Sequence, residues 1–285
     1  MIVTPIAQRW PGRVSFALSG AGYVVAAIIL FWGFTSGKFS IPGGDALIWD
    51  RVGDEIRNGV SPYYPVSGSG GFYYAPPWAL WFALASWLPV QVTAILMTAL
   101  EIAALRYIAG SWLRVGHCLC LPLVAFELPS SQVNLLMAAA IAAALRGDPR
   151  AAVVMAFAKL SPALAIELRD WRRAALLAGV VAAMTVPWAG LWADWAGQLV
   201  GSFGQNIGPG ATIEIPFLPR LVVALLLVAI RRPWARGLAA IIATPALYWV
   251  SWILLLGLLP RPRSRREPAR AVRLIETAVV DPAEP

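Results

Sequence analysis

The sequence predicts an all-α protein whose helices cross a membrane several times. Hydrophobic residues make up 59% of the 285 residues and charged residues only 13%, whereas an average soluble domain carries about 25% charged residues. Several apolar runs approach the roughly 20 residues that a helix needs to cross the hydrocarbon layer. The runs are continuous and rich in Ala and Leu, without the alternation of a barrel strand, so we expect transmembrane helices.

The basic residues set the expected orientation of these helices. The formal net charge is +8, and most Lys and Arg residues lie at the ends of apolar runs and in residues 261–285, where basic residues influence topology. We therefore attribute the positive charge to topology and expect no nucleic-acid partner. Cys118 and Cys120 lack metal-ligand spacing, so we expect neither a metal centre nor a disulfide there.

The first predicted span is residues 14–36, and Arg9 and Arg13 before it place the N-terminus in the cytoplasm. The apolar stretch is too long for a cleavable signal, and no small-residue cleavage site follows it. Residues 37–75 then form a first outside loop. This loop contains an amphipathic helix, which we expect to lie on the membrane surface with one apolar face made of Leu47, Ile48, Val52 and Ile56.

Five further apolar runs come next after the loop. Residues 76–88 are a short run that ends at Pro89, and residues 90–112 are long enough to span. Runs 116–128 and 131–146 are each too short to cross alone, so we expect a pair that meets at Leu128-Pro129-Ser130-Ser131. Run 150–168 has arginines near both ends and contains Lys159 and Pro162, which predicts a broken or re-entrant element.

The last part of the chain has less distinct boundaries. Residues 174–188 are expected to cross outward, residues 189–215 contain no Lys or Arg and are predicted as a second outside loop, and residues 216–231 return. The final run, 237–259, fits either a single crossing or a hairpin bent near Pro245.

These elements together predict a single transmembrane domain over residues 1–260. Residues 261–285 form an Arg-rich tail, which we expect to be disordered and to contact anionic lipid headgroups. The expected location is a bacterial inner (plasma) membrane, with several passes and a cytoplasmic N-terminus.

Four short motifs follow one another in residues 45–173. Asp45 precedes a Gly-x-Ser-Pro-Tyr turn at 59–63 by about one amphipathic helix. A Tyr-x-Pro-Pro helix start at 74–77, a Gln-Val-Asn helix start at 132–134 and a Lys-x-x-Pro element at 159–162 come next. Their order and spacing resemble the polyprenyl-phosphate-sugar-dependent glycosyltransferases of the GT-C superfamily. The resemblance is greatest to glycosyltransferase family 87, the branch that holds the mycobacterial mannosyltransferases of phosphatidylinositol mannoside synthesis.

Two departures from that family stand in the sequence. Members usually have more transmembrane helices after the Lys-x-x-Pro element, and they usually have Gly where this chain has Ser131. The chain therefore resembles a shortened member of the family.

The resemblance implies a GT-C-like helical bundle whose active site faces the extracytoplasmic side. The implied reaction moves a mannose-like sugar from a polyprenyl-phosphate carrier to a lipid or glycan acceptor. A carboxylate of the first loop acts as general base on the acceptor hydroxyl, an effect typically worth about 10²–10⁴ in rate. The leaving group is a lipid phosphate, so a second carboxylic acid is not needed, in contrast to glycoside hydrolysis.

Asp45 and Lys159 are the two residues that we expect to carry the chemistry. Asp45 matches the loop carboxylate of the family and is predicted to be the base, although Asp at a helix start is also a preferred N-cap. Lys159 lies in an apolar run, where a lysine costs roughly 2.5–3.5 kcal/mol at the centre of a membrane. A lipid phosphate would be its partner; the alternative is that Lys159 snorkels to the interface.

Other polar residues are expected to bind the substrate. Tyrosines are also common at membrane interfaces, and a buried amide such as that of Asn134 can equally bond a neighbouring helix. Glu101 is a candidate to pair with a basic group on another helix, and Glu127 is a minor candidate on the acceptor side. The predicted substrate-binding residues are Asp50 (also the reserve base), Tyr63, Tyr64, Tyr74, Gln132 and Asn134.

Two other classes of protein fit the same composition. A small-solute or lipid transporter, including a flippase, also uses broken helices and buried polar residues. The polar residues concentrate at the outer face and no inverted repeat is visible, which favours the enzyme; an inactive membrane partner protein is the third interpretation. No cofactor is expected, and a divalent cation stays open because the loop carboxylates form no recognisable ligand motif.

Overall fold

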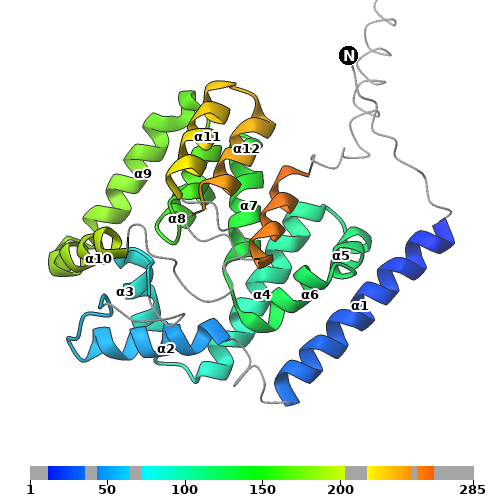
Figure 1. Cartoon of the computed structure of the whole chain (residues 1–285). Helices are drawn as coiled ribbons and strands as arrows, with labels where there is room; N and C mark the ends of the chain where they lie inside the picture. Colours follow the sequence, from blue (N-terminus) through cyan, green and yellow to red (C-terminus); the bar gives the residue numbers. More distant parts are fainter. Residues whose placement is uncertain (1–11, 36–43, 65–71, 203–216, 245–248, 260–285) are drawn as a thin grey trace, which may run out of the picture.

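The computed structural model describes residues 12–35, 44–64, 72–202, 217–244 and 249–259 (Figure 1). Every regular element in these residues is a helix, which confirms the predicted all-α class. Two helices are long and apolar enough to cross a membrane, and the number rises to four if two bent helix pairs each count as one span. These lengths and compositions agree with a membrane protein. The tail 261–285 lies outside the described residues.

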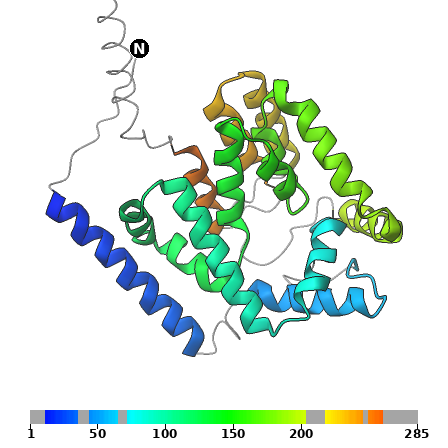
Figure 2. The ribbon, with the colours of Figure 1, turned by 180° about the vertical axis from the view of Figure 1, so that it is seen from behind.

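The long helix α1 (Gly12–Thr35) matches the first predicted span and lies along one edge of the molecule (Figures 1 and 2). It packs against α5 (Trp112–Leu119) and α6 (Pro122–Ser130). Gly22 lies so close to the backbone of Gly116 that a Cβ on Gly22 would be 1.8 Å from the Gly116 carbonyl oxygen. A glycine is therefore required where α1 crosses α5.

The amphipathic helix of the first loop is α2 (Gly44–Arg57), close to its predicted bounds. Its fully buried side chains are Ala46, Trp49 and Val52, and the Trp49 ring stacks on Phe82 of α3 (Pro76–Ala85) with 4.8 Å between ring centroids. We expected the apolar face of this helix to turn to the membrane surface. The face that contains Ala46, Trp49 and Val52 is instead covered by α3. Ring stacking and full burial of a tryptophan favour this packing over exposure.

The bent pair predicted around Pro129 is present. Helix α6 ends at Ser130, and α7 (Asn134–Leu145) follows at an angle of 113°. Ser131 makes the turn with φ of 54°, in the left-handed region that favours glycine. Helix α7 is almost wholly buried and packs against α4 (Val90–Ala109), α8 (Arg150–Ala156) and η4 (Trp249–Leu258), so it is the centre of the bundle.

The predicted broken element after α7 is also present. Helix α8 stops at Ala156, and short 3-10 turns η1 (Ser161–Ala165) and η2 (Leu168–Asp170) follow before α9 (Trp171–Ala183) begins. Lys159 therefore lies in the break, where the chain makes no continuous helix.

The second outside loop, predicted over 189–215, is wrong in its first part. Helix α10 (Ala189–Ser202) follows α9 through the turn η3 (Val186–Trp188) at a bend of 61°. The absence of basic residues suggested a loop, but the partly buried side chains Leu191, Trp195 and Gln198 fall at helical spacing. Residues 203–216 of the predicted loop lie outside the described residues.

The last two apolar runs form three elements, α11 (Phe217–Ala229), α12 (Pro233–Ile242) and η4. The final run is not one straight helix: α12 ends near Ala243, and η4 packs back against both α12 and α7. Pro245, where the hairpin was expected to bend, lies outside the described residues. Arg220 anchors the segment, because its Nη1 donates to the carbonyl oxygen of Thr244 at 2.7 Å.

Candidate active site

Asp45 is the second residue of α2, within its first turn. A carboxylate at this position is stabilised by the positive end of the helix dipole. Asp45 lies inside the helix, so it is not the N-cap residue, which precedes the first helical residue. Asp45 is half-buried. Burial raises the pKa of Asp45 from 3.8 to about 6, while the positive charge of Lys159 acts in the opposite direction.

Lys159 is half-buried in the break after α8 and interacts electrostatically with both Asp45 and Glu127. Its ammonium donates one long hydrogen bond, 3.5 Å from Nζ to the Oδ1 atom of Asn134. No direct ion pair joins Asp45 to Lys159 within the described residues. The carboxylate and the ammonium are therefore within electrostatic range of each other without direct contact.

Asn134 links Lys159 to a carboxylate of α6. The Asn134 backbone N–H donates to Glu127 Oε1 at 3.0 Å, and its side-chain Nδ2 donates to Glu127 Oε2 at 3.3 Å. The same Nδ2 donates to Gln132 Oε1 at 2.9 Å. Three residues at the α6–α7 bend thus form one polar network with Lys159. Glu127, only a minor candidate by its sequence position, is a central member of it.

Tyr74 forms one side of the same region. Its ring packs against Trp78, Phe72 and Phe82, and it interacts electrostatically with Asp45 and Glu127. The Tyr63 hydroxyl donates to the Tyr74 carbonyl oxygen at 2.8 Å. Tyr63 therefore supports Tyr74 through the backbone.

Two contacts bring the Tyr74 segment to the Lys159 segment. The Ala75 N–H donates to the Phe157 carbonyl oxygen at 2.7 Å, and Trp78 Nε1 donates to the Val154 carbonyl oxygen at 3.1 Å. The start of α3 is thereby fixed to the end of α8, two residues before Lys159. No local pattern in either segment predicts this pairing, because it is a long-range backbone contact.

Two of the predicted residues lie elsewhere. Asp50 interacts electrostatically with Asp54 and Arg57 of its own helix, and within the described chain it forms no hydrogen bond or ion pair with Lys159 or Asn134. The Tyr64 hydroxyl donates to Glu55 Oε1 at 2.8 Å, and the Arg51 guanidinium lies over the Tyr64 ring. The structure therefore groups Tyr64 with the second half of α2 and not with Asp45.

Glu101 of α4 is a second buried carboxyl, which the sequence pattern did not place in the site. It is 0% exposed, and neither carboxylate oxygen has a hydrogen-bond partner in the described part of the chain. The suggested pairing with a basic group on another helix is not found there; its electrostatic neighbours are Glu127 and Asp45. A buried carboxyl without a donor or a cation is strongly favoured in its neutral form.

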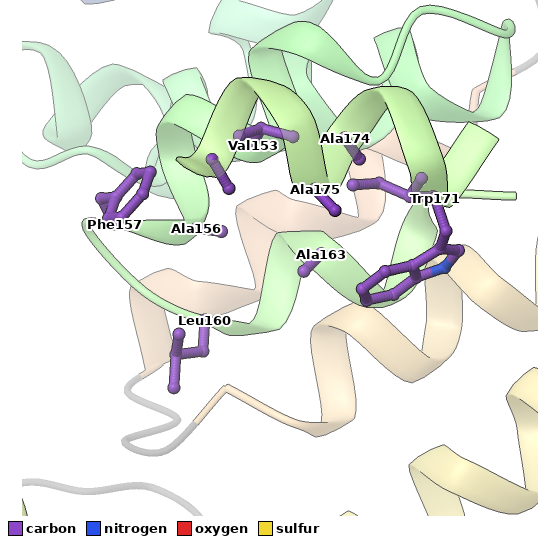
Figure 3. A pocket seen from close by; sticks show the side chains of 10 residues that line it. Val153, Ala156, Phe157, Leu160, Ala163, Trp171, Ala174 and Ala175 are labelled. Atoms are coloured by element: carbon purple, nitrogen blue, oxygen red, sulfur yellow. The ribbon is translucent and has the colours of Figure 1, made fainter. Parts of the chain in front are cut away.

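An apolar cavity of about 180 Å³ lies beside the break that holds Lys159. Figure 3 shows side chains from α8, from the segment around Leu160 and from the start of α9 surrounding it. Its lining includes Phe157 and Leu160, the residues two before and one after Lys159 in the chain, and it contains no polar surface. A hydrocarbon chain is the type of ligand that such a wall accepts.

No group of three or more potential metal ligands occurs among the residues that the structure describes. Searches against protein-family models, curated proteins and solved structures find no match for this chain. The function must therefore follow from the site itself: one half-buried carboxylate, one half-buried ammonium, an amide network and an apolar cavity.

Proposed function

We propose that this chain is a membrane-embedded, inverting glycosyltransferase with a GT-C-like fold. It would transfer a mannose-like sugar from a polyprenyl-phosphate carrier to a lipid or glycan acceptor at the outer face of a bacterial inner membrane. The observation that carries the proposal is the position of Asp45 and Lys159: the two opposite charges, far apart in the sequence, lie within electrostatic range without forming a direct ion pair.

In the proposed step the acceptor oxygen attacks the anomeric carbon of the donor sugar. The bond from that carbon to the phosphate oxygen breaks, and its electron pair stays on the lipid phosphate. The acceptor hydroxyl proton moves to the Asp45 carboxylate, which acts as general base. Lys159 stabilises the charge that grows on the phosphate, and the pKa of about 6 for Asp45 keeps most of it ionised at pH 7.

The amides and the apolar cavity fit the two ends of such a donor. Gln132 uses its Oε1 to accept from Asn134, so its Nε2 points away from that bond and can donate to a sugar or phosphate oxygen. The cavity between α8 and α9 begins beside Lys159 and suits the first part of an isoprenoid chain. Cation and apolar wall together match a lipid with an anionic head.

The test is sugar transfer from radiolabelled polyprenyl-phosphate mannose to total membrane lipid by purified protein in detergent. We compare wild type with Asp45→Asn and with the matched control Asp50→Asn, which changes a neighbouring carboxylate of the same helix. Labelled lipid product from wild type and Asp50→Asn, but none above background from Asp45→Asn, is the expected result. No product from wild type with mannose or any other lipid-linked sugar in a panel would refute the enzyme.

A transporter or flippase is the second candidate, and Glu101 is the observation that favours it. A buried carboxyl with no hydrogen-bond partner among the described residues, set in an apolar helix, is typical of proton and ion pathways in membrane transporters. This function needs a sealed bilayer and forms no covalent product. Solute or lipid movement in proteoliposomes that Glu101→Gln abolishes, without any labelled glycolipid, would establish transport in place of transfer.

A further inference from the structure

We propose that Glu127 is a positioning residue: it fixes the side-chain amide of Asn134, and this amide aims the Lys159 ammonium at the phosphate of a lipid substrate. The inference rests on the proposed function for the identity of that substrate. The geometry of the network, however, is independent of it.

Glu127 is 0% exposed and directs both carboxylate oxygens at one residue. Its Oε1 accepts from the Asn134 backbone N–H, and its Oε2 accepts from Asn134 Nδ2. Both contacts are donated by nitrogens of Asn134, so the face of the Asn134 side-chain amide that meets Glu127 is its nitrogen.

The opposite face of the same amide meets the lysine. The oxygen and nitrogen of a side-chain amide are distinguished by their partners, and here three partners agree. Glu127 Oε2 and Gln132 Oε1 both lie against Nδ2, at 3.3 Å and 2.9 Å, while Lys159 Nζ lies 3.5 Å from Oδ1. A turned amide would set its oxygen against two acceptors and its NH₂ group against an ammonium.

This arrangement determines what Lys159 offers to a ligand. An ammonium has three donors, and Asn134 Oδ1 engages one of them. The remaining donors of Lys159 can bind a phosphate, and Phe157 and Leu160, which flank Lys159 in the chain, line the apolar cavity. Glu127 therefore acts on the phosphate site without touching the phosphate.

Exchange of the two side-chain types tests the orientation directly. In Glu127→Gln, the NH₂ group of the new glutamine faces the NH₂ group of Asn134. We expect the Asn134 amide to turn and present a donor to Lys159. In Asn134→Asp, two carboxylates face each other. In the double variant Glu127→Gln/Asn134→Asp, Gln accepts from the backbone N–H and donates to Asp, whose second oxygen accepts from Lys159.

The measurement is the affinity of each purified variant for undecaprenyl phosphate, with undecaprenol as the uncharged lipid control. We expect each single substitution to weaken phosphate-lipid binding by about tenfold or more, the size of one lost charge-assisted hydrogen bond. The double variant should return to within a few-fold of wild type, and undecaprenol binding should not change. The matched control Glu55→Gln alters a carboxyl that accepts from the Tyr64 hydroxyl and forms no hydrogen bond with Asn134 in the described chain, and it should bind as wild type does.

The outcomes separate the two proposals. If wild type prefers the phosphate lipid over undecaprenol but Glu127→Gln binds it equally well, the role of Glu127 is wrong and the proposed function stands. The role of Glu127 is equally wrong if a folded double variant binds no better than the weaker single variant. If wild type shows no preference for the phosphate lipid, the proposed function is wrong and this inference falls with it. If the double variant does not fold, the comparison of Glu127→Gln with Glu55→Gln decides.

Discussion

The protonation of Asp45 connects the structure of the site to a measurable pH profile. A general base acts in its deprotonated form, and the pKa of Asp45 is raised to about 6, mainly by burial. The Lys159 charge opposes this rise. The two causes can be separated, because a substitution of Lys159 removes its charge and leaves the burial of Asp45 in place.

We expect the rate of sugar transfer to fall about tenfold per pH unit below pH 6, since each unit removes about nine-tenths of the ionised base. Lys159→Met removes the charge that stabilises the Asp45 carboxylate, so the acid limb should move to higher pH. Asp50→Asn should leave the limb in place. Initial rates at saturating donor between pH 4 and 8 provide the measurement, and an unmoved limb in Lys159→Met would show that the two groups are not coupled.

Ser131 carries a backbone strain that a single substitution relieves. Its φ of 54° is left-handed, and its buried hydroxyl has no hydrogen-bond partner in the described chain. The left-handed conformation costs a non-glycine residue roughly 1–2 kcal/mol. We expect Ser131→Gly to raise the free energy of unfolding by about 1 kcal/mol, although glycine loses more entropy on folding. Chemical denaturation in detergent measures the change, and Ser131→Ala, which also removes the hydroxyl but keeps the strained backbone, should gain less than Ser131→Gly.

At the scale of elements, the site depends on helices whose ends and crossings are set by single residues. The α6–α7 bend places Glu127 beside Asn134, and the break after α8 places Lys159 beside both. Helix α2 contributes Asp45 because its Trp49 face is held against α3. Asp45 and Asn134 therefore lie in the first turn of a helix and Lys159 lies in a break, whereas Glu127 lies within α6.

The crossing of α1 and α5 tolerates no side chain at Gly22. A Cβ there would lie 1.8 Å from the Gly116 carbonyl oxygen, whereas nothing lies within 4 Å of a Cβ at Gly20. We expect Gly22→Ala to destabilise the protein by about 1–3 kcal/mol, as overpacking does, and Gly20→Ala to change stability by less than about 0.5 kcal/mol. Thermal melting in detergent compares the two; equal midpoints would mean that α1 does not pack on α5 as described.

The cavity between α8 and α9 provides a test of lipid-chain binding that leaves the polar site untouched. Ala175 lines the cavity, and Ala183, on the same helix, is exposed and outside its lining. We expect Ala175→Trp to fill the cavity and raise the KM for a polyprenyl-phosphate donor several-fold with little change in kcat, because uniform binding is lost. Ala183→Trp is the matched control, and an equal effect of both substitutions would argue against the cavity as the chain site.

The whole molecule separates its polar site from its arginine-rich turns. Helices α2 and α3 lie at one end, and the α7–α8 turn, the start of α9 and the α11–α12 turn lie at the other (Figures 1 and 2). Arginines occupy these three places, at 146 and 150, at 169, 172 and 173, and at 231, 232 and 236. From the positive-inside rule we propose that this end faces the cytoplasm and that the end with α2 faces the outside.

Thiol labelling checks this orientation. In a background with Cys118 and Cys120 replaced by Ala, we introduce Asn58→Cys after α2 or Arg172→Cys at the start of α9; both positions are exposed. A membrane-impermeant maleimide should label position 58 in intact spheroplasts and position 172 only after the membrane is opened. The reverse pattern would place the site on the cytoplasmic side and contradict the proposed location.

The sequence by itself determined the class of protein and most helix boundaries. Long apolar runs, Pro129 and Pro162 act through local backbone chemistry, so the helical membrane class, the bent pair and the broken element followed from the pattern. Lys159 was found because a lysine inside an apolar run stands out against its neighbours. Asp45, Gln132 and Asn134 were selected because their motifs resemble those of a glycosyltransferase family.

Only the tertiary structure decided which of these residues meet. The contact of Ala75 with Phe157 joins two distant segments, and nothing local in either segment predicts it. Glu127 and Glu101 resembled isolated acids in apolar runs until packing placed one against Asn134 and left the other without a hydrogen-bond partner among the described residues. Helix α10 was missed because the charge pattern reports topology and not backbone conformation. The site is determined by packing between distant segments, which gives most buried polar groups a hydrogen-bond partner. Local sequence does not contain that information.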